Sequence, residues 1–81
     1  MNEIDYISRE VAAHVLYHFG SGGYAPGSFV ESLLVAFSRA DVNNHMRLSM
    51  AFPEYGFAME IAKNELGGID DLKKVLDENP R

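Results

Sequence analysis

Histidine is the side chain in this sequence with the widest range of possible chemistry, and two of the three histidines lie close together. His14 and His18 are four residues apart, so on a helix they share one face, a spacing that metal-binding helices use. His45 could add a third ligand, but a zinc site needs three or four ligands in fixed geometry, and no carboxylate lies at a recognised motif position. On a helical wheel, His18 lies at the edge of an apolar stripe and His14 lies further out, beside Glu10. We therefore predict boundary packing for this pair, with no metal and no other cofactor.

Other catalytic chemistry has little support in the sequence. The chain has no cysteine, and its serines include no Gly-x-Ser-x-Gly nucleophile elbow. The carboxylates are spread over polar positions rather than paired within an apolar run. The glycine-rich stretch 20–28 follows a predicted helix instead of a strand, and it lacks the lysine of a phosphate-binding loop. We predict no enzymatic activity and no small-molecule substrate.

Charge and hydropathy narrow the classes of partner and compartment. Twelve acidic side chains against seven basic ones give a net charge of −5, which argues against general nucleic-acid binding because phosphate contacts need Lys and Arg. The N-terminus lacks a basic-then-apolar signal pattern, and the longest apolar run, 33–37, is far shorter than the ~20 residues of a membrane span. The absence of cysteine suits a reducing compartment. We expect a cytoplasmic protein with no membrane contact.

The most apolar segment, from Ser28 to Arg39, is predicted to be the central helix. Ser28 and Glu31 have the spacing of a capping box, in which each side chain accepts a backbone amide hydrogen at the helix start. Apolar residues then cover more than half of the helix circumference: Phe29, Val30, Leu33, Leu34, Ala36, Phe37 and Ala40. A helix this apolar is expected to pack against neighbours on more than one side.

Further helices are predicted around this central helix from apolar spacing and from helix-ending residues. Their expected bounds are about 5–19, 42–52, 54–66 and, after Asp70 or Asp71, up to about 77. Gly20 should end the first, Asp41 should cap the next, and Pro53 should lie in the first turn of the third. No stretch alternates with a period of two, so no sheet is expected. The chain is therefore predicted to be a single all-α domain, 1–81, a compact bundle of four to five short helices around 29–40.

The predicted helix 42–52 has two contrasting faces. The residues expected to turn inward are Val42, Met46, Leu48, Met50 and Phe52, and those expected to face outward are Asn43, Asn44, Arg47 and Ala51. Asn and Arg are residue types that read base edges, so together with the preceding helix this segment resembles a helix-turn-helix. A single firm positive charge would anchor phosphates weakly. Sequence-specific DNA binding through Asn43, Asn44 and Arg47 is thus the alternative function.

A protein-binding surface is the preferred interpretation of the remaining features. Tyr24 lies in the middle of the glycine-rich loop, where an exposed tyrosine would be a suitable interface anchor. Val35 lies in the middle of the polar side of the central helix, where it is either covered by the fold or offered to a partner. With Arg39 at the polar rim, these residues form the predicted partner-binding patch. Gly56, which costs about 1 kcal/mol of helix propensity, allows close packing against a neighbour.

Residues 20–55 resemble small proteins of unassigned function encoded by actinobacterial phages and actinobacterial genomes. The residues that carry the resemblance are Gly22 to Tyr24, Pro26 to Phe29, Leu33-Leu34, Ala40-Asp41, Asn44, Arg47-Leu48 and Phe52-Pro53. The resemblance implies a phage or prophage setting, and it implies no known activity and no catalytic residue. We therefore predict a non-enzymatic protein-binding module, a phage accessory protein that docks on a host protein or on a second copy of itself.

Overall fold

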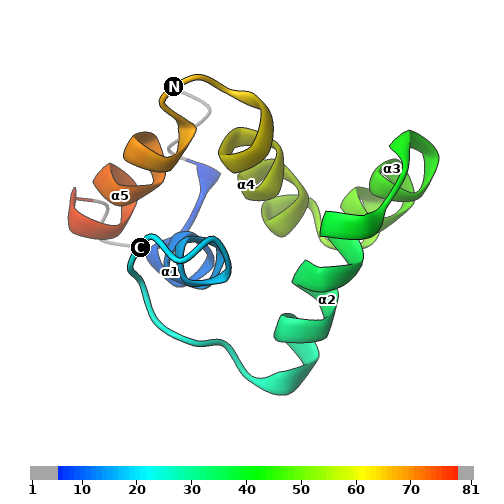
Figure 1. The fold of residues 1–81 in the computed structure, drawn as a ribbon, viewed down its shortest axis with the longest axis horizontal. Helices are drawn as coiled ribbons and strands as arrows, with labels where there is room; N and C mark the ends of the chain where they lie inside the picture. Colours follow the sequence, from blue (N-terminus) through cyan, green and yellow to red (C-terminus); the bar gives the residue numbers. More distant parts are fainter. Residues whose placement is uncertain (1–5, 79–81) are drawn as a thin grey trace.

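A computed structural model describes residues 6–78, and this part of the chain folds into five α-helices (Figure 1). The helices are α1 (Arg9–His18), α2 (Ser28–Arg39), α3 (Val42–Ala51), α4 (Pro53–Asn64) and α5 (Gly68–Glu78). No strand occurs within residues 6–78, so the all-α prediction is confirmed.

The hydrophobic core lies where α1, α4 and α5 pack together, with α2 closing one side (Figure 1). Its fully or almost fully buried residues are Ile7, Val11, Ala12, Val15, Leu16, Leu33, Leu34, Phe37, Ala58, Met59, Ile61, Leu72 and Val75. α4 contacts all four other helices, and α1 buries six consecutive residues, 11–16. The centre of the bundle is therefore formed by α1 and α4.

The prediction that helix 29–40 lies at the centre is wrong. α2 buries Leu33, Leu34 and Phe37 on one side, but Phe29 is 65% exposed and Ala36 is exposed as well. The apolar residues of a helix show which of its faces can be buried. They do not show how many neighbouring helices cover those faces. In this fold, α2 packs on α4 and, less extensively, on α1 and α3, and it uses a single stripe to do so.

α3 is the most exposed helix of the described chain. None of its residues is buried. It lies at the opposite side of the molecule from α5 and packs against α4 and α2 (Figure 1). Leu48 and Phe52 pack partly against the core, as expected. The inward prediction for Val42, Met46 and Met50 is wrong, since these side chains are 77%, 58% and 83% exposed.

Two helix starts and one helix end agree with the sequence signals. The Asp41 side chain accepts a hydrogen bond from the Asn44 amide at 2.8 Å and so caps α3, as predicted. Pro53 occupies the first turn of α4, where its missing amide hydrogen costs nothing. Gly20 has a φ of +72° directly after the end of α1, in agreement with its predicted helix-ending role.

Three other helix starts differ from the prediction. α1 begins at Arg9 because the Ser8 side chain accepts the Val11 amide; the expected start at Asp5 lies outside the described residues. α2 is capped by Gly27, whose carbonyl accepts the Glu31 amide at 3.0 Å, so Ser28 lies one residue too late to form the capping box. α5 begins at Gly68 instead of after Asp70 or Asp71. Gly67, with a φ of +75°, directly precedes α5, and its carbonyl oxygen accepts the Asp71 amide at 3.0 Å, so the first helical turn starts there.

Candidate functional site

α3 and α4 cross closely at one pair of residues, Ser49 and Gly56. A Cβ atom built on Gly56 would lie 2.2 Å from Ser49 Oγ and 3.0 Å from Ser49 Cα, so only glycine allows this approach. The close packing predicted for Gly56 is confirmed. Because the connection between the two helices is a single residue, Phe52, the helices meet here and a groove remains along the rest of their shared length.

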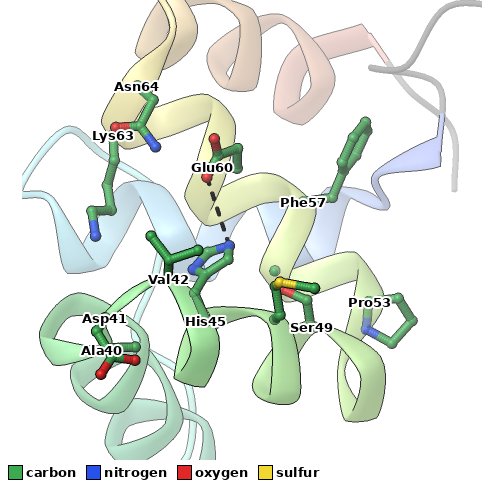
Figure 2. A pocket seen from close by; sticks show the side chains of 12 residues that line it. Ala40, Asp41, Val42, His45, Ser49, Pro53, Phe57, Glu60, Lys63 and Asn64 are labelled. Atoms are coloured by element: carbon green, nitrogen blue, oxygen red, sulfur yellow. Dashed lines mark ion pairs between the residues drawn. The ribbon is translucent and has the colours of Figure 1, made fainter.

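The groove between α3 and α4 has a volume of about 560 Å³ (Figure 2). Its walls are formed by Ala40, Asp41, Val42, His45, Met46 and Ser49 on the α3 side and by Pro53, Gly56, Phe57, Glu60, Lys63 and Asn64 on the α4 side. The α4 wall extends from Pro53 to Asn64, or about 16 Å at the rise of an α-helix. This is long enough for about three turns of a helix lying along it.

An exposed apolar ridge lies on α3 beside the groove, and two of its three residues also line the groove. We define the α3 ridge as Val42, Met46 and Met50, which follow one another at intervals of four residues and therefore line up along one side of the helix. All three side chains are exposed. Near the C-terminal end of α3, the exposed ring of Phe29 packs against Phe52 with ring centres 5.8 Å apart. The ridge is thus a continuous exposed apolar side of a helix, not a single scattered residue.

His45 joins α3 to both of its neighbours. Its Nε2 lies 3.6 Å from Glu60 Oε2 on α4, and its ring meets the buried Phe37 ring of α2 edge-on at 5.4 Å (Figure 2). His45 therefore connects α3 to both α2 and α4 beside the groove.

Three charged side chains line the groove. Asp41 and Glu60 are acidic, Lys63 is basic, and all three are exposed. The groove and the α3 ridge thus form an apolar surface with a mixed polar rim.

The partner-binding residues predicted from the sequence lie at separate places. Val35 is 39% exposed and lines a smaller pocket of about 270 Å³, whose other walls are Tyr17, His18, Pro26, Glu31 and Leu34. Tyr24 is 52% exposed and its ring packs edge-on against His14, with ring centres 5.5 Å apart. Arg39 is exposed at the end of α2. Their role in binding stays a prediction.

The three residues of the DNA-binding alternative are all exposed on α3. Asn43, Asn44 and Arg47 occupy the first two turns, and Arg47 Nη1 donates a hydrogen bond to Asn44 Oδ1 at 3.1 Å. The Asn44 amide is also bound by the Asp41 cap. None of the three lines the groove between α3 and α4.

A buried aromatic cluster around His14 was missed by the sequence analysis. His14 is only 8% exposed, and its Nδ1 shares a hydrogen bond of 2.8 Å with the Tyr55 hydroxyl on α4. The prediction that His14 lies further out than His18 is wrong, because α4 and the Tyr24 ring cover that side of α1. Burial, and then the charges of Glu10 and Glu54, raises the pKa of Tyr55 to about 12. The cluster ties α1, α4 and the glycine-rich loop together.

The three histidines have different partners in the structure. His14 bonds to Tyr55, His18 Nε2 lies 2.8 Å from Ser38 Oγ, and His45 pairs with Glu60. Within residues 6–78, no three His, Asp or Glu side chains are grouped so that they could hold a metal ion.

None of the helices in this part of the chain is long and apolar enough to cross a membrane.

Comparisons with known proteins add no assignment. No protein-family model matches the chain, and no curated protein or solved structure matches it either. The resemblance of residues 20–55 to phage proteins therefore stays a prediction.

Proposed function

We propose that the chain is a non-enzymatic protein-binding module and that it binds its partner with the α3 ridge and the groove beside it. The observation that carries this proposal is the exposure of Val42, Met46 and Met50 on a helix with no buried residue. Three large apolar side chains in a row are costly to leave in water, and such a row marks an interaction surface more often than a chance exposure.

The shape of the site supports a helical partner. A groove flanked by two helices and about three turns long suits an amphipathic helix, which would place its apolar side between the α3 ridge and Phe57. Methionine side chains are flexible and polarizable, so Met46 and Met50 can adapt to the surface that covers them. The polar rim of Asp41 and Lys63 would then set the orientation of the partner.

The proposal is tested by protein capture with matched variants. Wild-type chain, Met46→Lys/Met50→Lys and Leu66→Lys are immobilised and exposed to a lysate of the organism that encodes the chain, and bound proteins are quantified by mass spectrometry. Leu66 is the control because it is fully exposed in the turn between α4 and α5, away from α3 (Figure 1). Each substitution adds one positive charge at an exposed position.

We expect at least one protein, which can include a second copy of the chain, to be retained by the wild type and by Leu66→Lys. The Met46→Lys/Met50→Lys chain should lose it by more than about tenfold, because a buried ammonium group opposes binding. Equal retention by all three chains, or retention by none, would contradict the proposal.

DNA binding through Asn43, Asn44 and Arg47 is the second candidate function. The observation in its favour is that all three side chains are exposed on a single outlying helix. Under this alternative, affinity for duplex DNA should rise steeply as salt is lowered and should fall on Arg47→Ala. Weak, salt-insensitive retention with no effect of Arg47→Ala would exclude it.

The biological setting is part of the same proposal. The resemblance supports a phage or prophage accessory role, and the absence of cysteine supports a cytoplasmic location. The partner would then be a host protein or a second copy of the chain.

A further inference from the structure

We infer that the smaller pocket, between the last turn of α1 and α2, binds a primary alkylammonium group. Its volume is about 270 Å³, just below the usual range of ligand sites, which suits one small molecule or a single long side chain. It shares no residue with the groove between α3 and α4, so the inference does not rest on the proposed function. The pocket is lined by Tyr17, His18, Pro26, Glu31, Leu34 and Val35.

Glu31 supplies the negative charge of the pocket. Its backbone amide bonds to the Gly27 carbonyl, but its carboxylate makes no hydrogen bond or ion pair within residues 6–78. Arg39, the basic residue of α2, lies two turns or about 12 Å further along the helix and does not line the pocket. A cationic ligand would give this carboxylate a partner, whereas an anionic one would be repelled by it.

His18 supplies a hydrogen-bond acceptor. The Ser38 hydroxyl donates its one hydrogen to the Leu34 carbonyl at 3.0 Å, so it accepts in its 2.8 Å contact with His18 Nε2. In a neutral His18 the hydrogen is therefore on Nε2, and Nδ1 is an acceptor. Within the described chain no hydrogen bond uses this Nδ1, so it is available to a ligand that donates.

The surroundings of these two groups also favour a cation. Tyr17 and His18 belong to the last turn of α1, and the C-terminal end of a helix carries partial negative charge. Neither a lysine nor an arginine lines the pocket, so an anion would find the Tyr17 hydroxyl as its one donor among the lining side chains of a neutral site. The net charge of −5 adds attraction for a cation at longer range.

The apolar walls determine the rest of the ligand. Leu34 is fully buried, while Pro26, Val35 and the Tyr17 ring are partly exposed, so an unbranched alkyl chain can cover apolar surface here. A primary ammonium group has three hydrogens to donate, and a tyrosine ring attracts a cation through its face. This site also gives Val35 a role, because its exposed side chain forms part of the pocket wall.

The first measurement titrates the full chain with n-pentylammonium chloride at constant ionic strength and follows its NMR signals. We expect saturable shifts at Leu34, Val35 and His18, with a dissociation constant of about 1–10 mM for a probe of about six non-hydrogen atoms. Ethylammonium should bind at least about tenfold more weakly, because each buried methylene group contributes up to about fourfold. Pentanoate, with the same number of carbon atoms and the opposite charge, should bind at least about fivefold more weakly.

Two results of this titration overturn the inference. One is the absence of a saturable shift at these residues up to about 100 mM n-pentylammonium. The other is equal binding of pentanoate, which would show that the pocket selects the alkyl chain and not the charge.

The second measurement repeats the titration on matched variants. Glu31→Gln keeps the size of the side chain and removes its charge, and it should weaken n-pentylammonium binding about two- to fivefold, the range of an exposed ion pair. Glu65→Gln is the control, because Glu65 is exposed in the turn between α4 and α5 and its substitution changes the net charge equally. Its affinity should equal that of the wild type. Equal affinities for the two variants overturn the inference, since net charge alone would then explain the attraction.

A further probe distinguishes two sources of the ammonium group. N-acetyl-lysine N-methylamide carries the lysine side chain on a blocked backbone. If it binds as tightly as n-pentylammonium, the pocket accepts a lysine side chain of a protein. If it binds markedly more weakly, the walls exclude the backbone and the ligand is a free alkylamine.

Discussion

Among the titratable residues of the described chain, Tyr55 has the most strongly shifted pKa. Its hydroxyl shares a hydrogen bond with His14 Nδ1, and the two rings stack in parallel with centres 6.1 Å apart. Burial is the main cause of its raised pKa, and the nearby carboxylates of Glu10 and Glu54 add to it, since both disfavour a phenolate. The fold therefore holds Tyr55 in its neutral form over a wider range of pH than an unfolded chain does.

We predict a loss of stability in alkali that depends on Tyr55. The folded pKa is about 12 and the unfolded value is 10.0, so the contribution is complete below pH 10 and is lost as the pH rises from 10 toward 12. Urea unfolding followed between about pH 8 and pH 12 should show a steeper fall for the wild type than for Tyr55→Phe. Tyr6, Tyr17 and Tyr24 remain in both chains, so parallel pH profiles for the two would rule out the assignment.

Gly23 is the residue at which the glycine-rich loop meets α1. It has a φ of +72°, and a Cβ atom on it would lie 2.0 Å from the Ala13 carbonyl oxygen. Gly23 thus lies directly against the backbone of Ala13, which is fully buried. The loop therefore acts as a cover for α1, and Gly23 alone allows it to come so close.

Gly20 provides a matched control for a prediction at Gly23. Gly20 has the same φ of +72°, but a Cβ atom there would have no neighbour within 4 Å. Gly20→Ala should lower the free energy of unfolding by roughly 1–2 kcal/mol through backbone strain alone. Gly23→Ala should lower it by a further 1–3 kcal/mol or so, as overpacking does. The two values follow from chemical denaturation, and equal losses would mean that the loop does not pack on Ala13.

Among the helices, α3 packs on its neighbours without fully burying any side chain of its own. Its N-terminus is capped by Asp41, His45 in its middle contacts Glu60 and Phe37, and Ser49 approaches Gly56 closely. Leu48 packs partly against the core. The groove and the α3 ridge thus depend on a polar cap, the contacts of His45, one glycine and one partly buried leucine.

We predict that Gly56→Ala displaces α3. Alanine gains about 1 kcal/mol of helix propensity over glycine, but its Cβ would collide with Ser49, so a net loss of roughly 1–2 kcal/mol is expected. Ser49→Gly removes the side chain that the added methyl group would meet. A double-mutant cycle of the two substitutions should therefore show a favourable coupling of about 1 kcal/mol or more. Additive losses would indicate that the two helices do not touch at this point.

For the molecule as a whole, the sequence predicted the number of helices well and their burial less well. Gly20, Asp41 and Pro53 determine local backbone geometry directly, so the helix boundaries near them were predictable. Burial depends on which neighbour arrives at a face, and an apolar stripe looks the same whether it is covered or exposed. For this reason, α2 was expected at the centre and the α3 ridge was expected in the core, while α1 and α4 form the centre.

The candidate site was harder to predict for the same reason. Besides the apolar side chains of Val42, Met46 and Phe57, the groove is lined by small and polar residues such as Ser49 and Gly56, which carry no binding signal of their own. Helical spacing did group Val42, Met46 and Met50 on one side. Whether that side meets the protein or the solvent depends on how α3 packs on α4, and this packing leaves the ridge exposed.

This division into a buried bundle and an outlying helix predicts unequal local stability. Amides open with a free energy that grows with the apolar area buried around them, and α1 buries six residues where α3 buries none. In hydrogen exchange on a dilute sample, the amides of α3 should therefore exchange at least about tenfold faster than those of α1 and α4. Asp41→Ala should speed exchange in α3 further, since loss of a cap costs about 1 kcal/mol, and should leave α1 unchanged.

The same experiment connects the fold to the proposed binding surface. Adding an excess of the protein retained in the capture experiment should slow exchange in α3 and along the groove wall of α4, because binding adds the burial that the single chain lacks. The rates in α5, on the opposite side of the molecule, should not change (Figure 1). Exchange in α3 that is as slow as in α1 already in the dilute sample would show that α3 is an integral part of the core, and the argument for an uncovered helix would then be lost.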